Sequence, residues 1–142
     1  MQKPPLLPYL LLALAMIGLG DTAYLSYFQY MNLVPSCAIG GCEVVLTHAW
    51  SKFLGIPWSY IGLVYYAYLF CLAVLLIIDP RSYGLRLGAL VYTGEGVLFS
   101  LWAMGYVQWY IIGALCLYCG VSAITTVLAS SVAFIYYRKT NA

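Results

Sequence analysis

The sequence predicts an all-α membrane protein, a four-transmembrane-helix bundle with a short amphipathic helix in the first extracytoplasmic loop. Hydrophobic residues make up 65% of the 142-residue chain and charged residues only 7%, whereas soluble domains carry about 25% charged residues. Four apolar segments are each long enough to cross a bilayer, which takes about 20 helical residues. Lysine and arginine gather on one side of these segments. Residues 1–142 are expected to form one domain, and the net charge of +2 does not indicate a nucleic-acid partner.

The four apolar segments can be bounded from the sequence. The first runs from Leu6 or Pro8 to Tyr30, the second from after Pro57 to about Ile78, the third over 85–107 and the fourth over 110–137. A chain inside hydrocarbon has to satisfy its backbone hydrogen bonds internally, so each segment is predicted to be a helix. A tight turn around Gln108 is expected between the third and the fourth.

The positive charges predict the orientation in the membrane. An even number of spans places both termini and the second connection on one side. That side holds Lys3, Arg81, Arg86, Arg138 and Lys139, and the opposite side holds only Lys52. Because positively charged loops stay in the cytoplasm, both termini are predicted to be cytoplasmic. The first connection, residues 32–56, then lies on the extracytoplasmic face.

Within that connection, the stretch "EVVLTHAWSKFLG", residues 43–55, separates polar and apolar residues onto two faces of a helix. It is too short to span the bilayer. We expect a short amphipathic helix that lies on the membrane, covers the end of the bundle and carries Cys42 at its start.

Four of the five cysteines form two pairs on the same predicted face. Cys37 and Cys42 stand in "PSCAIGGCEVV", and Cys116 and Cys119 stand in "CLYC", in the first two turns of the predicted fourth helix. Residues three apart on a helix share a face, so the second pair can close a disulfide after a small adjustment. The glycines of the first pair allow its loop to bend. Two dithiols on one face can exchange through mixed disulfides, which makes these cysteines candidate catalytic residues.

Other readings of the cysteines stay open at this point. The four residues could form two structural disulfides in a non-enzymatic membrane subunit, or a zinc site, although their spacing is unlike that of usual zinc sites. A small transporter is a further class, but no inverted repeat is visible. Cys71 stands alone in the second segment and is expected to pack as a small buried hydrophobe. No metal is expected, and the chain has no glycine-rich phosphate loop.

Three parts of the sequence resemble the vitamin K epoxide reductase family in its bacterial and archaeal branch. They are the C-x4-C of Cys37 and Cys42, "EVVLTHAWSKFLGIPWSYIG" and "FSLWAMGYVQWYIIGALCLYC". The resemblance implies a four-helix membrane oxidoreductase that passes electrons from thiols to a quinone of the ubiquinone, menaquinone or vitamin K type. It also implies a thioredoxin-like partner with a C-x-x-C site, here expected as a separate protein, and vitamin K antagonists as inhibitors. The other bacterial four-helix disulfide-forming family is the main rival, but it keeps both cysteine pairs in outward loops.

The resemblance also implies a role for each thiol. Cys37 matches the thiol that exchanges with the partner, Cys42 the thiol that passes electrons to Cys116, and Cys119 the thiol nearest the quinone. The chain departs from the family pattern at two places. His48 stands where a serine is frequent, and Trp58 lies close to the place where animal members have an asparagine that holds the quinone oxygen.

Aromatic residues near the helix ends could form the walls of a quinone pocket, although aromatic belts also occur at membrane interfaces without binding anything. The candidates for quinone contact are Trp58, Tyr60, Trp102, Tyr106 and Tyr118, together with His48 as a proton donor. Asp21 and Glu95 fall within the spans, where a carboxyl is a functional candidate by default. We expect both to be protonated and hydrogen-bonded to hydroxyl groups of neighbouring helices.

Overall fold

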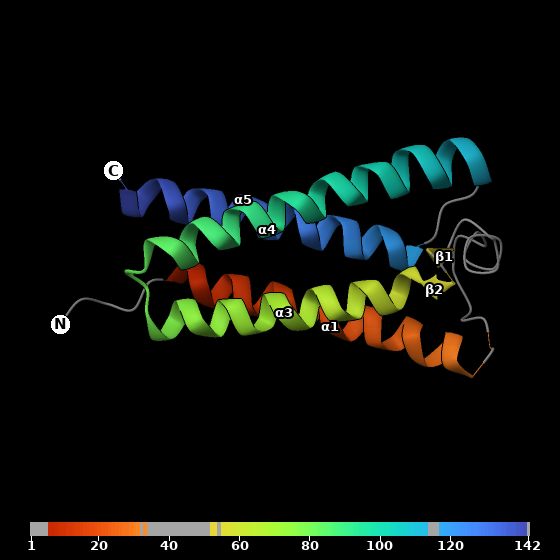
Figure 1. The fold of residues 1–142 in the computed structure, drawn as a ribbon, viewed down its shortest axis with the longest axis horizontal. Helices are drawn as coiled ribbons and strands as arrows, with labels where there is room; N and C mark the ends of the chain where they lie inside the picture. The colour runs from red at the N-terminus through yellow and green to blue at the C-terminus, as the bar shows by residue number, and fades with distance from the viewer. Residues whose placement is uncertain (1–5, 32, 34–51, 54, 114–116, 142) are drawn as a thin grey trace.

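The computed structural model describes residues 6–31, 33, 52–53, 55–113 and 117–141. These residues form a bundle of long helices, shown in Figure 1. In chain order its elements are α1 (Leu6–Tyr30), the two-residue strands β1 (Lys52–Phe53) and β2 (Ile56–Pro57), α3 (Trp58–Ile78), α4 (Tyr83–Leu101), the π-helical η2 (Trp102–Ile112) and α5 (Leu117–Asn141). Within these described residues, four helical segments are long and apolar enough to span a membrane, with η2 continuing α4. The predicted four-helix membrane fold is confirmed.

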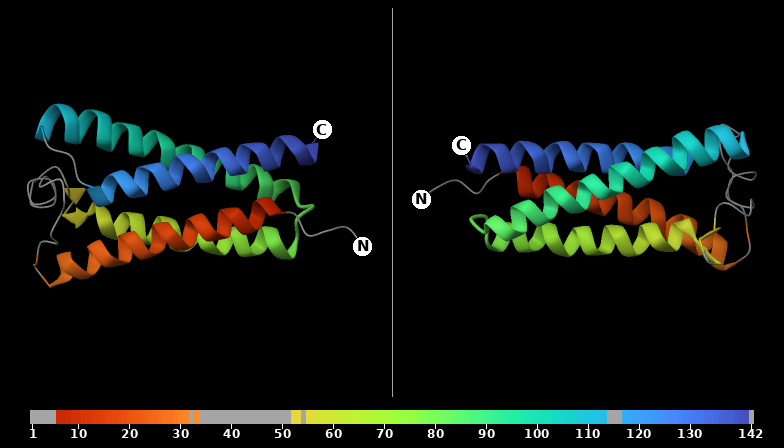
Figure 2. Two further views of the ribbon diagram at one scale, coloured as in Figure 1. Left: turned by 180° about the vertical axis from the view of Figure 1, so that it is seen from behind. Right: turned by 45° about the horizontal axis from the view of Figure 1, so that its top comes forward.

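The helices run up and down, so that their connections alternate between the two ends of the bundle (Figures 1 and 2). The start of α1, the α3–α4 connection and the end of α5 lie at one end. The end of α1, the start of α3, the end of η2 and the start of α5 lie at the other. We call the first the terminal end and the second the thiol end, because Cys119 stands in the first turn of α5.

The boundary between the third and fourth spans differs from the prediction. Gln108 does not lie in a turn but inside η2, where it is buried. The helix stops at Gly113, which has a φ of 76° and donates its backbone N–H to the carbonyl of Gln108 at 2.8 Å. A left-handed residue after the last turn is a common helix stop, and glycine adopts it without steric cost. The predicted fourth span therefore began too early, because residues 110–112 belong to the third.

The predicted amphipathic helix is wrong at its C-terminal end. Lys52 and Phe53 form β1, which pairs antiparallel with Ile56 and Pro57 of β2. Gly55 lies in the turn with a φ of 84°, a conformation that favours glycine. Residues 43–51 and 54 of the predicted helix lie outside the described part of the chain. The short hairpin brings the chain directly to the first residue of α3.

The packed core fills the half of the bundle nearer the terminal end. α1 packs against α3 and α5, and α4 packs against α5, whereas α3 and α4 contact one another less. The buried core residues are Leu11, Ala15, Tyr66, Leu69, Ala73, Leu76, Ala89, Ala129, Ala133 and Tyr136. The alanines allow close approach of the helix backbones, as is usual in membrane bundles. Because α3 and α4 are less closely packed, space remains between the helices nearer the thiol end. Cys71, predicted to be buried, is exposed on α3.

Gly18 gives a direct test of this packing. A Cβ atom there would collide with the ring of Tyr66, which is only 1% exposed. Gly20 on the same helix has no atom within 4 Å of such a Cβ. Alanine favours helix by about 1 kcal/mol over glycine, whereas overpacking costs about 1–3 kcal/mol. We expect Gly18→Ala to lower the thermal unfolding temperature in detergent and Gly20→Ala to leave it unchanged or raise it. Equal unfolding temperatures for the two variants would contradict the assigned α1–α3 contact.

Candidate functional site

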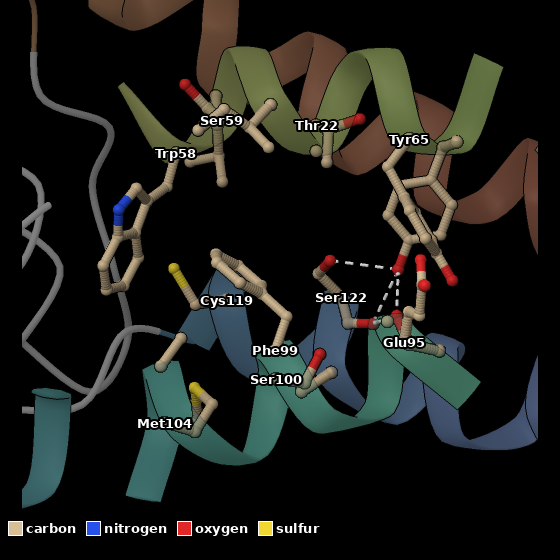
Figure 3. A pocket seen from close by; sticks show the side chains of 18 of the residues that line it. Thr22, Trp58, Ser59, Tyr65, Glu95, Phe99, Ser100, Met104, Cys119 and Ser122 are labelled. Atoms are coloured by element: carbon tan, nitrogen blue, oxygen red, sulfur yellow. Dashed lines mark hydrogen bonds between the residues drawn. The ribbon is translucent and has the colours of Figure 1, made fainter. Parts of the chain in front are cut away.

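A cavity of about 260 Å³ lies between the helices, lined by residues of α1, α3, α4, η2 and α5 (Figure 3). Its size is near the lower end of the range for ligand pockets, which is about 300–1,000 Å³. Most of the lining is apolar or aromatic. Polar side chains lie at both ends of the cavity, and Thr22 and Ser100 lie between them (Figure 3). The cavity therefore suits a small, flat and mostly apolar molecule with polar groups at its edges.

One end of the cavity holds the thiol. Cys119 is half-buried in the first turn of α5, and its sulfur points toward the indole of Trp58 on α3 (Figure 3). Ser59, the next residue of α3, donates a hydrogen bond from its hydroxyl to Oε1 of Gln29 on α1. Both Ser59 and Gln29 line the cavity. This end combines a nucleophilic sulfur, an aromatic wall and a pair of polar side chains from different helices.

The other end is built around the hydroxyl of Tyr66. This hydroxyl donates to the backbone carbonyl of Ser122 at 2.7 Å and contacts the side-chain oxygens of Ser122 at 3.0 Å and Thr126 at 2.8 Å. Thr126 in turn donates to the carbonyl of Ser122 at 2.9 Å. Glu95 and Tyr65 lie beside this network (Figure 3). The network links α3 to α5 and makes this end of the cavity polar.

Aromatic pairs connect α3 to α4 on one side of the cavity. The rings of Trp58 and Phe99 have centroids 5.8 Å apart, and Trp58 lies 5.7 Å from Trp102. Closer to the polar end, Tyr65 stacks on Tyr92 with centroids 4.6 Å apart and planes at 10°. The Tyr92 hydroxyl donates to the carbonyl of Tyr65 at 2.9 Å. These contacts bridge two helices that pack less closely against one another than α1 packs against α3 or α4 against α5.

The structure brings some of the predicted site residues together. Cys119 and Trp58 line the cavity. Trp102 is not among the lining residues but contacts the ring of Trp58. Tyr60, Tyr106 and Tyr118 are not among its lining residues. Tyr106 stacks on Tyr110 at 5.9 Å, and Tyr118 contacts Tyr24 at 5.4 Å. The remaining predicted residues, Cys37, Cys42, His48 and Cys116, lie outside the described part of the chain.

Several lining residues were missed by the sequence reading. Ser122, Ala123 and Thr126 follow Cys119 at spacings of three, four and seven residues, which places them on one face of a helix. This signal was present in "CGVSAITT". Tyr65 and Tyr66 had no such signal, because their place in the cavity depends on how α3 packs against α1 and α5.

The two intramembrane carboxyls, Asp21 and Glu95, lie in different surroundings. Oδ2 of Asp21 is buried and has no hydrogen-bond partner among the described residues. Glu95 has an exposed side chain that also lines the cavity at its polar end. Glu95 is therefore placed where it can meet a bound molecule, and Asp21 is not among the lining residues.

The chain matches one family model over most of its length. The model described as the vitamin K epoxide reductase family covers residues 9–134. This range begins in the first turn of α1 and ends near the last turns of α5. It contains every residue that lines the cavity and all four of the paired cysteines.

Proposed function

The chain belongs to the vitamin K epoxide reductase family, and from this premise we propose that it passes electrons from a reduced thioredoxin-like protein, through its two cysteine pairs, to a quinone. Family membership makes it a membrane oxidoreductase. The single observation that carries the finer proposal is the position of Cys119, whose sulfur lies at one end of a largely apolar and aromatic cavity inside the bundle (Figure 3). The proposed role is to support disulfide bond formation in other proteins.

The lining of the cavity fits a quinone ring. A quinone is flat and apolar, with carbonyl oxygens that accept hydrogen bonds at its edge. Trp58 and Phe99 offer aromatic walls, and the amide of Gln29 can donate to an oxygen near the thiol end. At the other end, the Ser122 hydroxyl can turn from Tyr66 toward a second oxygen. Gln29 and Ser59 thus offer the polar contact for which animal members have an asparagine.

The proposed transfer begins at the Cys37–Cys42 pair. A thiolate of the reduced partner attacks Cys37 of the Cys37–Cys42 disulfide and releases Cys42, and the second partner thiol then frees Cys37. Cys42 attacks Cys116 of the Cys116–Cys119 disulfide and releases Cys119. Cys37 then displaces Cys116 and restores the Cys37–Cys42 disulfide. Each step exchanges one thiolate for another through a mixed disulfide.

The last step, reduction of the quinone, needs no reductant other than Cys116 and Cys119. Cys116 and Cys119 give up two electrons and two protons when they close their disulfide, and these are what a quinone takes up to become a quinol. Trp58 would hold the quinone ring against Cys119, and the helices around the cavity would keep water from the reacting sulfur. The carrier is lipid-soluble and can reach a cavity inside a membrane bundle from the bilayer itself.

We also propose that the thiol end faces away from the cytoplasm. The α3–α4 connection with Arg81 and the last turn of α5 with Arg138 and Lys139 lie together at the terminal end (Figure 1). The residues that flank the Cys37–Cys42 segment, Tyr30 and Trp58, end and begin their helices at the thiol end. A reporter that is active only in the cytoplasm should be active when fused after Ala142, and an inactive fusion that is still expressed would reverse the orientation.

Turnover by the purified protein tests the function. The protein in detergent receives a reduced thioredoxin-like protein with a C-x-x-C site and, in turn, ubiquinone, menaquinone or vitamin K quinone. We expect loss of quinone absorbance with at least one of them and one new partner disulfide for each quinol formed. A partner with alkylated thiols is the control. Absence of turnover with all three quinones would favour the reading of the cysteines as structural disulfides.

A further inference from the structure

Glu95 is a carboxyl near the middle of the span Tyr83–Ile112 that the proposed transfer leaves without a role. The residues that α4 and η2 contribute to the cavity wall are spaced as on one face of a helix. They are Tyr92, Glu95, Gly96, Phe99, Ser100 and Ala103, with Met104 beside them. Glu95 therefore stands within the helix face that is turned to the cavity, although part of its side chain is exposed.

The residue after Glu95 brings α4 against the polar end of the cavity. A Cβ atom on Gly96 would collide with the hydroxyl of Tyr65 and with the side chain of Thr126. Thr126 belongs to the hydrogen-bond network around the hydroxyl of Tyr66. Because Gly96 has no side chain, the helix can approach this network closely, and Figure 3 shows Glu95 beside it. The carboxyl of Glu95 is thus part of the polar end.

The surroundings of Glu95 favour the form of the carboxyl that carries a proton. Among the described residues that line the cavity, none is lysine, arginine or histidine. An ionised carboxyl inside a membrane is costly and is usually paired. The other acidic groups of the lining are the thiol of Cys119, at the opposite end, and the phenols of Tyr65, Tyr66 and Tyr92. A phenol is a far weaker acid than a carboxyl, so Glu95 is the strongest proton donor at the polar end.

We propose that Glu95 is a catalytic residue that donates a proton to the quinone oxygen at the polar end of the cavity. This inference rests on the proposed function and adds the route of one proton. Electrons enter the ring from Cys119 at the opposite end, so the thiols do not reach this oxygen while the ring is in place. As the ring takes up electrons, negative charge develops on its oxygens, and a group placed to neutralise that charge speeds the reaction.

The protons balance over one turnover. The O–H bond of Glu95 breaks as an O–H bond of the quinol forms at the polar end. Closing the Cys116–Cys119 disulfide releases two protons. One of these goes to the quinol oxygen near the thiol end, and the other restores the carboxyl of Glu95, which is unchanged after the cycle.

Glu95→Gln tests the proposal, because glutamine has nearly the same shape and keeps hydrogen-bonding atoms but has no acidic proton. Proton transfer by a positioned side chain contributes typically 10²–10⁴-fold, so kcat in bilayer discs should fall at least about 100-fold with little change in KM. Glu95→Asp keeps the acidic proton on a shorter side chain and should recover part of this loss. Asp21→Asn is the matched control, since Asp21 is an intramembrane carboxyl that is not among the lining residues. It should keep the wild-type kcat.

Two kinetic results would overturn the proposal. One is a kcat in Glu95→Gln close to that of wild type. The other is a loss in Glu95→Asp or in Asp21→Asn as large as that in Glu95→Gln, because it would report a disturbance of packing rather than a missing proton.

Infrared difference spectroscopy gives a second readout that needs no turnover. Quinone is added to protein whose cysteines are oxidised, so that no electrons are transferred. The C=O stretch of a protonated carboxyl should shift as that carboxyl donates to the quinone oxygen, and the shift should persist in Asp21→Asn and vanish in Glu95→Gln. Bound quinone without a carboxyl shift would overturn the proposal while leaving the proposed function intact. A protein that reduces no quinone contradicts the proposed function, and the carboxyl shift would then still decide whether Glu95 meets the ring.

Discussion

Cys119→Ala is expected to reduce quinone turnover to less than about 1% of the wild-type rate, because catalytic residues that act as a unit lose nearly all activity when one is removed. Without Cys119, Cys116 has no partner with which to close the disulfide that supplies two electrons. The loss should appear with every quinone that the wild-type protein reduces.

Two further variants separate chemistry from packing in this result. Cys71→Ala removes a thiol that is exposed on α3 and is not among the cavity-lining residues, so it should keep full turnover. Cys119→Ser keeps a side chain of similar shape in the cavity and should be as inactive as Cys119→Ala. Substantial turnover in Cys119→Ser would show that the sulfur of this residue is not the reductant, and the reaction would have to take place at other residues.

The second large effect is a trapped disulfide between the two cysteine pairs. In a Cys71→Ala background, the Cys37→Ala, Cys119→Ala variant retains Cys42 and Cys116 as its only two of the five cysteines. If Cys42 attacks Cys116, this variant has no thiol left to resolve the mixed disulfide. We expect nearly complete formation of Cys42–Cys116 under mild oxidation, detected by protection from a maleimide reagent and by mass spectrometry of linked peptides.

A matched variant checks the order of transfer. Cys42→Ala, Cys119→Ala in the same background retains Cys37 and Cys116, which are not expected to exchange directly. It should remain largely open to the maleimide reagent under the same conditions. If Cys37–Cys116 forms as readily as Cys42–Cys116, the assignment of Cys42 as the internal carrier is wrong.

The sequence was sufficient for the spans whose ends carry a strong signal. α1 and α3 lie where they were predicted. The ends of α3 are marked in the sequence, because the helix begins directly after Pro57 and ends before "DPRS". The end of the third span was missed because "WYII" continues the apolar run through the segment where the prediction placed a turn and a new helix. What ends the helix there is the left-handed backbone at Gly113, and hydropathy does not report backbone conformation.

The site could be predicted only in part, for a related reason. Cys119 and Trp58 follow from a motif and from a helix start, and Ser122 and Thr126 could have been found from their spacing to Cys119. The place of Tyr66 in the site could not be predicted, because it depends on Gly18 of the neighbouring helix, which has no side chain. The Tyr66 ring occupies the space that a Cβ on Gly18 would need, and its hydroxyl reaches across to α5. Such pairings between helices are set by packing and leave no local pattern.

The most direct test of the central claim is a visible spectrum of two variants, Cys116→Ala and Cys119→Ala, which each lack one cysteine of the second pair. Each is purified and mixed with quinone between pH 6 and pH 9. Cys116→Ala leaves the Cys119 sulfur at the edge of the cavity, and a thiolate against an electron-poor ring should give a charge-transfer band. We predict this band in Cys116→Ala, growing as the thiol ionises with rising pH, and no band in Cys119→Ala. A band only in Cys119→Ala would reverse the two roles, and a band in neither variant would contradict a quinone site beside Cys119.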